Sequence, residues 1–235
     1  MKLSYNFSPN YSRQVRNVKS IKFVIIHYTG MQSEIESIKR LKSFKHKVSC
    51  HYLINRKGNI IQMVREKHIA WHAGKSRWQN YNNLNDSSLG IELVNKGHRI
   101  YYENFTKEQI NSLIKLCKFI KKKYRIKKEN FLGHSDIAPL RKIDPGEKFP
   151  WERLSKHKIG KWYQINKNNF KFKKKEIENL FFKNLDKIGY KYFNKNLRKK
   201  TDKKIIKSFQ SHFLPKNITG KIDQKSLIIS HFLAN

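Results

Sequence analysis

Two short apolar runs, each followed by a histidine, constrain the fold of this chain more than any other feature. The first run spans residues 23–26 and leads into His27, and the second spans residues 131–133 and leads into His134. Short runs of this kind, rich in β-branched and aromatic residues, are typical of buried strands. We therefore expect each histidine at the rim of a sheet, on a rigid element.

A third polar residue follows the second run. Residues 133–146 read GHSDIAPLRKIDPG, and Asp144 lies beyond Pro139, which cannot continue a helix. Two histidines and one aspartate are a sufficient ligand set for a catalytic zinc ion with an open fourth position. A histidine after a strand is also commonly a hydrogen-bonded rim residue, and the spacing alone does not decide between these two interpretations.

The remaining patterns predict an α/β fold. Helices are expected at residues 33–44 and 106–124, each of which begins with a capping-box pattern. Strands are expected at residues 51–54, 60–64 and 89–94, and the first two form a hairpin. Strands that alternate with helices indicate a mixed central sheet flanked by helices, with residues 75–87 as a polar loop near the site.

The C-terminal part of the chain has a different character. Residues 155–171 carry few periodic apolar residues and are expected to form a connector. Apolar residues then recur at helical spacing near residues 175–190, 202–213 and 224–233, which predicts a small three-helix domain. The expected organisation is a lead segment, a catalytic domain, a connector and a helical domain, at residues 1–20, 21–154, 155–171 and 172–235.

Six motifs in chain order carry a family resemblance. They are VIIHYT at 24–29, VSCHYLI at 48–54, AWHAG at 70–74, SLGIELVN at 88–95, the stretch at 133–146 and FPW at 149–151. With these motifs, residues 21–154 resemble the zinc-dependent N-acetylmuramoyl-L-alanine amidases of the type-2 amidase family, which are related to the peptidoglycan recognition proteins. The sequence RKIDPG at 141–146 and the added C-terminal module are most similar to the AmiD-like branch of that family.

The resemblance implies a site and a reaction. His27, His134 and Asp144 match the zinc ligands, with one Zn²⁺ per chain. Glu92 matches the general base, and Lys142 matches the lysine that stabilises the oxyanion. The implied activity is that of a bacterial peptidoglycan hydrolase in cell-wall degradation or recycling. It cleaves the amide between the lactyl group of N-acetylmuramic acid, intact or 1,6-anhydro, and L-Ala of the stem peptide by zinc-activated water.

Other residues in or near these motifs have two interpretations. An aromatic or histidine side chain there either lines the substrate groove or packs in the core or rim; these residues are Tyr28, Tyr52, Trp71, His72 and Trp78. Arg141 is either a contact for a stem-peptide carboxylate, which suits the bidentate guanidinium group, or a structural residue. His51 is expected to pack in the core.

The helical domain carries one motif of its own. Phe209-Gln210 with residues 219–223 resembles the peptidoglycan-binding domain type 1. This resemblance implies binding to the cell wall. The alternative is a helical cap that only packs against the catalytic domain.

Charge and composition restrict the classes of partner that this chain is expected to bind. The chain has 52 basic and 17 acidic residues, a net charge of +35, but the excess is spread along the whole chain and is mostly lysine. Specific phosphate recognition favours arginine, so we expect no nucleic acid as a ligand. The family resemblance implies peptidoglycan or muropeptides as the ligands. We expect a monomer with reduced cysteines, no transmembrane segment and no signal peptide. The default location is then the cytoplasm, with the periplasm or cell envelope as the alternative.

A second function class uses the same fold. A non-catalytic peptidoglycan recognition protein would share the motifs, but binding-only relatives typically lack a metal ligand. The presence of Asp144, Glu92 and Lys142 together therefore favours the enzyme.

Overall fold

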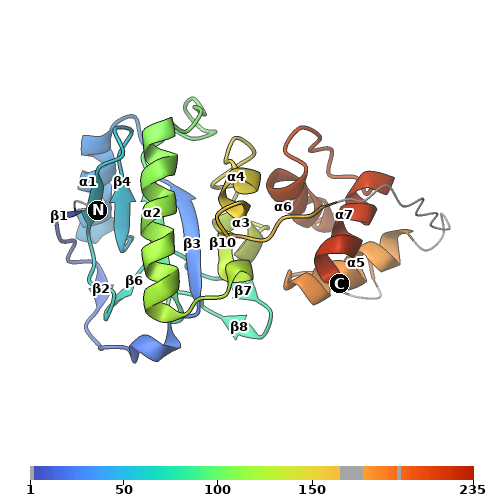
Figure 1. The fold of residues 1–235 in the computed structure, drawn as a ribbon, viewed down its shortest axis with the longest axis horizontal. Helices are drawn as coiled ribbons and strands as arrows, with labels where there is room; N and C mark the ends of the chain where they lie inside the picture. Colours follow the sequence, from blue (N-terminus) through green and yellow to red (C-terminus); the bar gives the residue numbers. More distant parts are fainter. Residues whose placement is uncertain (1–2, 165–176, 195–196) are drawn as a thin grey trace.

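A computed structural model describes residues 3–164, 177–194 and 197–235. Its centre is a six-stranded sheet in the order β1-β5-β4-β9-β3-β10. Figure 1 labels β1, β4, β3 and β10 of this sheet. These strands are β1 (Leu3–Tyr5), β3 (Phe23–Tyr28), β4 (Tyr52–Ile54), β5 (Ile60–Gln62), β9 (Ser88–Leu93) and β10 (Phe131–Gly133). Strands β4 and β5 pair antiparallel, whereas the other neighbours pair parallel, which confirms the predicted mixed sheet.

Short strands and helices complete the fold. Two-stranded sheets pair β2 (Tyr11–Ser12) with β6 (Ile69–Ala70), and β7 (Arg77–Trp78) with β8 (Tyr81–Asn82). The α-helices are α1 (Glu34–Lys42), α2 (Lys107–Tyr124), α3 (His134–Ile137), α4 (Trp151–Ser155), α5 (Ile177–Ile188), α6 (Asp202–Phe213) and α7 (Gln224–Ala234). Single 3-10 turns occur at Val18–Ser20, Phe44–His46 and Lys128–Asn130.

Helix α2 covers one face of the sheet (Figure 1). It begins at a full capping box, in which the Thr106 hydroxyl accepts from the Gln109 N–H and the Gln109 side chain accepts from the Thr106 N–H. Its apolar residues recur at helical spacing and pack against Val24 and Ile26 of β3, in one buried cluster. The helix therefore begins and ends where the sequence predicts.

The opposite face of the sheet carries the polar end of β3. Side chains alternate along a strand, so Phe23, Ile25 and His27 point away from α2. Phe23 and Ile25 belong to a second buried cluster, distinct from the one under α2. Helix α1 covers another part of this face, where Leu41 packs with Leu53 of β4. His27 thus lies on the face of the sheet opposite α2.

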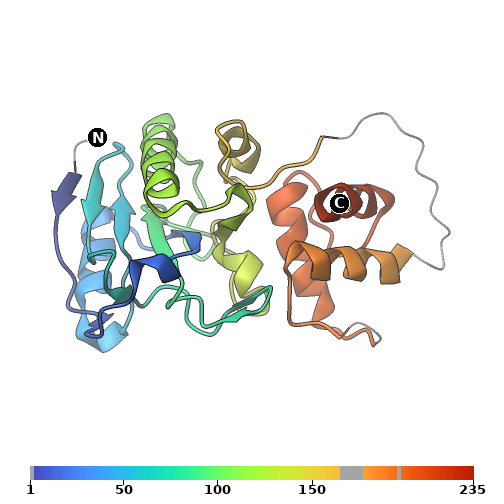
Figure 2. The same cartoon turned by 60° about the horizontal axis from the view of Figure 1, so that its bottom comes forward.

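The three C-terminal helices share a core with the sheet. Buried residues of α5, α6 and α7 form one apolar cluster with Ile25 of β3 and Leu132 of β10. The C-terminal helices lie beside α3 and β10 in both views (Figures 1 and 2). The helical cap expected as the alternative is therefore present as a packed unit, whereas binding to the cell wall stays a prediction.

The motif of the helical unit is used inside it. The Gln210 side chain accepts from the Gly220 N–H at 2.8 Å and donates to the Lys221 carbonyl at 2.8 Å. The Asp223 side chain caps α7 by accepting from the Ser226 N–H at 2.7 Å. Phe209 is fully buried. These residues hold the loop between α6 and α7, so the motif has a structural role within the unit.

Buried polar contacts join the helical unit to the turn after His134. The Asp136 carboxylate accepts from the Tyr190 hydroxyl at 2.6 Å and contacts His212 Nδ1 at 2.8 Å. The Ser208 hydroxyl donates to the Ser135 carbonyl at 2.8 Å. Buried polar groups are costly unless they are paired. The unit is therefore fixed against the α/β part of the chain by specific bonds as well as by apolar packing.

We expect Phe209→Ala to lower the free energy of unfolding by about 3–5 kcal/mol, because it leaves a cavity in the shared core. Phe209 packs against Phe181 at a ring-centroid distance of 5.2 Å and is fully buried. The matched control is Phe119→Ala on α2, whose side chain is 50% exposed, for which we expect less than about 0.5 kcal/mol. Urea denaturation measures both values, and equal effects would contradict the shared core.

Two features differ from the sequence-based expectation. The lead segment supplies β1, which pairs with β5, so the sheet begins well before residue 21. Residues 77–82 form a small hairpin, and no residue of 75–87 lines the cleft described below. The connector beyond residue 164 and the start of the helical domain up to residue 176 lie outside the described residues. Within the described part of the chain, no helix is both long and apolar enough to span a bilayer.

Candidate active site

The register of three parallel strands brings the candidate residues to one level. His27 on β3 lies opposite Glu92 on β9. Gly133 on β10 lies opposite Ile26, so the next residue, His134, falls at the level of His27. His134 begins α3 at the carboxyl end of its strand, where α/β sheets commonly bind ligands. Pairing between distant segments therefore builds the site.

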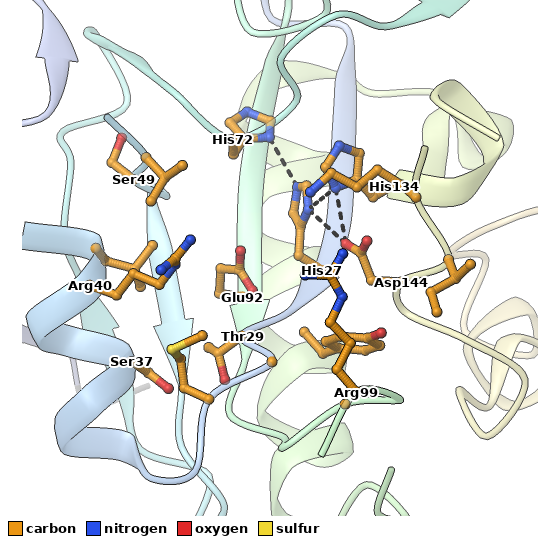
Figure 3. Close-up of a pocket in the computed structure, with 18 of the residues that line it drawn as sticks. His27, Thr29, Ser37, Arg40, Ser49, His72, Glu92, Arg99, His134 and Asp144 are labelled. Carbon is orange, nitrogen blue, oxygen red and sulfur yellow. Dashed lines mark hydrogen bonds and ion pairs between the residues drawn. The ribbon is translucent and has the colours of Figure 1, made fainter. Parts of the chain in front are cut away.

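His27, His134 and Asp144 form a compact group that could hold a metal ion, as Figure 3 shows. The two Nδ1 atoms are 2.9 Å apart, and Asp144 Oδ2 lies 3.1 Å from His27 Nδ1 and 3.0 Å from His134 Nδ1. All three side chains are buried. One aspartate oxygen and two imidazole nitrogens thus converge on one point.

The charge states of this group suit a cation. Burial and the neighbouring His134 lower the pKa of His27 to about 4, so its ring is neutral at pH 7. Burial opposes ionisation of Asp144, but the two histidines hold the pKa of its carboxyl well below its usual range. Metal binding requires neutral imidazole and ionised carboxylate. His27 and Asp144 therefore already have the charge states that a divalent metal needs at neutral pH.

Glu92 is the second carboxylate of the site. It extends from β9 into the same cleft, and its Oε2 is buried without a hydrogen-bond partner among the described residues. Burial and the charge of Asp144 raise the pKa of Glu92 to about 8, and the nearby Lys142 opposes this shift. A perturbed carboxylate with an unused oxygen in a cleft is typical of a group that exchanges protons with a ligand.

The cleft has a volume of about 420 Å³ and contains the metal-ligand group, Glu92 and Lys142. Of the other residues that the sequence suggested, Tyr28, Trp71, His72 and Arg141 also line it. Arg40 of α1 and Arg99 lie at its sides (Figure 3), and Lys96 lines it too. No motif marked these three cations, because they come from segments that only the fold brings to the cleft.

Two of the suggested groove residues lie elsewhere. Tyr52 is buried under α2, and its hydroxyl donates to Glu66 at 2.7 Å. Trp78 is buried against the helical unit, with its ring 4.8 Å from that of Tyr190. Neither lines the cleft, so for both residues the structure favours packing in the protein interior over a place in the substrate groove. His51 is likewise buried, and its Nδ1 accepts from the Gly90 N–H at 3.0 Å.

His72 and Arg141 line the cleft but direct polar atoms into the protein. His72 Nδ1 lies 3.1 Å from His27 Nε2, and its Nε2 lies 3.2 Å from the Ser88 hydroxyl. Arg141 Nε donates to the Lys75 carbonyl at 3.0 Å, and Nη2 donates to the Ala73 carbonyl. Both ring nitrogens of His72 are thus used within the protein, and two of the three nitrogens of Arg141 bind backbone.

Comparison with known proteins identifies the family. Residues 17–147 match the family model described as N-acetylmuramoyl-L-alanine amidase. The N-acetylmuramoyl-L-alanine amidase AmiD of Escherichia coli is 36% identical over 230 residues, which is 91% of this chain and 82% of the relative.

Two solved structures of complexes are similar over nearly the whole chain. One is AmiD from Escherichia coli with the substrate anhydro-N-acetylmuramic acid-L-Ala-D-γ-Glu-L-Lys; its TM-score is 0.80 at 32% identity, over 94% of this chain and 91% of that one. The other is AMPDH3 from Pseudomonas aeruginosa with anhydromuramic pentapeptide, with a TM-score of 0.81 at 29% identity over 95% of each chain. With the family match over more than half of its length, this chain belongs to the N-acetylmuramoyl-L-alanine amidase family.

Proposed function

We propose that this protein is a zinc-dependent amidase that cleaves the bond between N-acetylmuramic acid and L-Ala in muropeptides. The observation that carries the proposal is the convergence of His27, His134 and Asp144 beside Glu92 in one cleft. A recognition protein would need the cleft but would have no use for a buried carboxylate with a raised pKa beside a metal-ligand group.

Zinc is the metal that these residues suit best. Imidazole nitrogen with one carboxylate oxygen is a common catalytic zinc set, and it leaves a position open. When bound there, zinc supplies a Lewis acid that polarises a carbonyl and lowers the pKa of water to about 7. His27, His134 and Asp144 would hold it.

Glu92 and Lys142 would move the proton and stabilise the developing charge. The Glu92 carboxylate accepts a proton from the attacking water and passes it to the leaving amine of L-Ala. The positive charge of Lys142 lowers the pKa of Glu92 and so favours the ionised form that can act as a base. The ammonium group of Lys142 also donates to the carbonyl oxygen of the scissile amide as negative charge develops there.

The charge of the cleft supports a substrate with carboxylates. Arg40, Lys96 and Arg99 line the cleft, and a stem peptide presents carboxylate groups along its length. The substrate in the AmiD complex is an anhydro-muropeptide, and AMPDH3 was also solved with one. We infer that 1,6-anhydro-muropeptides are substrates of this protein. The resemblance of Phe209-Gln210 and residues 219–223 to the peptidoglycan-binding domain type 1 supports a second inference, that the helical unit contributes to binding of larger wall fragments.

Digestion of purified muropeptides, both intact and 1,6-anhydro, tests the proposal. We expect release of a peptide that begins with L-Ala, detected by mass spectrometry, with full loss after chelation and recovery on addition of zinc. Magnesium is the control ion, because it prefers oxygen ligands and should not restore activity. Binding of muropeptides by folded, zinc-loaded protein without cleavage would instead support the recognition-protein alternative.

A further inference from the structure

The dipeptide His72-Ala73 contacts the Nε2 atom of both histidines in the metal-ligand group, the ring nitrogen that faces away from Asp144. His72 Nδ1 lies 3.1 Å from His27 Nε2, and this contact is drawn in Figure 3. The carbonyl oxygen of the next residue, Ala73, lies 3.1 Å from His134 Nε2. His72 and Ala73, called here the 72–73 segment, therefore face both histidines from one side.

The direction of each hydrogen bond follows from the groups around the segment. The Ser88 hydroxyl donates to the Leu84 carbonyl, so its oxygen accepts from His72 Nε2 at 3.2 Å. With its proton on Nε2, neutral His72 has an acceptor at Nδ1, which takes a hydrogen bond from His27 Nε2. The Ala73 carbonyl can only accept, so His134 Nε2 donates to it. Both ligands are thus left with an unprotonated Nδ1 that faces Asp144.

The 72–73 segment is fixed by contacts that lie outside the metal site. The Asn85 side-chain oxygen accepts from the His72 N–H at 3.1 Å and from the Ala73 N–H at 2.7 Å. The His72 ring rests directly on β9, because a Cβ at Gly90 would come within 2.3 Å of His72 Cγ. His72 is 8% exposed. Asn85 and Gly90 thus hold the acceptors for both ligands in place, together with Ser88 at His72 Nε2 and Arg141 at the Ala73 carbonyl.

We propose that His72 and Asn85 are positioning residues that fix the tautomer and orientation of His27 and His134. The inference rests on the proposed metal site and assigns roles to two residues outside the ligand set. Hydrogen bonds to the outer nitrogen of a histidine ligand orient the ring and raise its basicity, and their loss typically weakens metal binding by about 10–100-fold. His72 acts through its own ring, and Asn85 acts through the backbone of both residues.

The dissociation constant for zinc, measured by competition with a chromophoric chelator, tests this inference. We expect Asn85→Ala and His72→Phe to raise it by about 10–100-fold. Asn85→Asp keeps an oxygen at the same place and should retain most of the affinity. Asn82→Ala, on exposed β8 nearby, is the matched control and should leave the affinity unchanged. The melting temperature of each chelator-treated variant separates loss of metal affinity from loss of folding.

The outcomes distinguish this inference from the proposed function. Wild-type affinity in Asn85→Ala and His72→Phe, with muropeptide cleavage intact, would overturn the positioning roles and leave the amidase in place. An equal loss in Asn85→Asp and Asn85→Ala would also overturn them, because the acceptor oxygen would then not matter. If wild-type protein bound no zinc, the proposed function would be wrong and the inference with it.

Discussion

Glu92→Gln is expected to reduce kcat for muropeptide cleavage by about 10²–10⁴-fold while zinc binding stays intact, since general-base catalysis contributes about this much. The glutamine side chain keeps the size and the hydrogen-bonding reach of Glu92 but cannot accept a proton. Glu92 lies opposite His27 across β9 and β3, yet it is outside the metal-ligand group, so the substitution should not release the metal. Zinc content by atomic absorption and kcat by chromatography of the products measure the two effects.

The same substitution should change how stability depends on pH. In chelator-treated protein, burial and Asp144 raise the pKa of Glu92 from 4.5 to about 8. The folded state then binds more protons than the unfolded state between these values, so stability falls as pH rises through this window. The glutamine side chain of the variant does not titrate. The melting temperature of the variant should therefore rise relative to that of the wild type as the pH increases from 5 to 8.

The control for both measurements is Glu108→Gln, an exposed glutamate at the start of α2 on the other face of the sheet. We expect neither its kcat nor its pH dependence to differ from wild type. Near-normal kcat in Glu92→Gln would remove Glu92 from the chemistry. Loss of zinc in this variant would show that Glu92 acts on the metal site itself.

The sequence predicts the parts of the site that depend on local patterns. Apolar runs predict the strands that end at His27 and His134, because a buried strand needs little beyond four or so apolar residues. Capping residues likewise locate the starts of α1 and α2, where Ser33 and Thr106 accept from backbone N–H groups. The metal-ligand group follows from these strands together with the family resemblance.

Long-range pairing and packing decide what the sequence leaves open. Tyr52, His72 and Trp78 lie in or near the motifs and look equivalent in the sequence, but of these three only His72 reaches the cleft. Trp78 is covered by the helical unit through Tyr190, a contact between residues far apart in the chain. The place of His72 depends on the absence of a side chain at Gly90, which becomes visible only when the strands are aligned.

Edge strands are a further feature that local sequence patterns do not predict. The strand β1 at residues 3–5 is short, and two of its three side chains are exposed, so it lacks the apolar signal that marks β3. It forms because β5 offers unpaired backbone groups at the sheet edge. A backbone partner that is distant in sequence leaves no trace in the local pattern.

Lys142→Ala is expected to reduce kcat by about 10²–10³-fold without loss of zinc, the effect typical of removing one donor to a developing oxyanion. Lys142 lines the cleft beside Asp144, and its charge lowers the pKa of Glu92. The variant should therefore show a second, separate effect. With that charge removed, the pKa of Glu92 rises, and the acidic limb of the pH–kcat profile moves to higher pH.

This shift in the pH profile separates the two roles of Lys142. Lys142→Arg keeps the charge, so it should keep the wild-type acidic limb, even where the longer side chain lowers kcat by misplacing the donor. Lys115→Ala, on the exposed side of α2, is the matched control and should change neither quantity. A large loss of kcat in Lys142→Ala with an unmoved acidic limb would limit Lys142 to oxyanion stabilisation. Wild-type kcat in that variant would exclude both roles, and the polarisation of the amide would then depend on the metal and Glu92 alone.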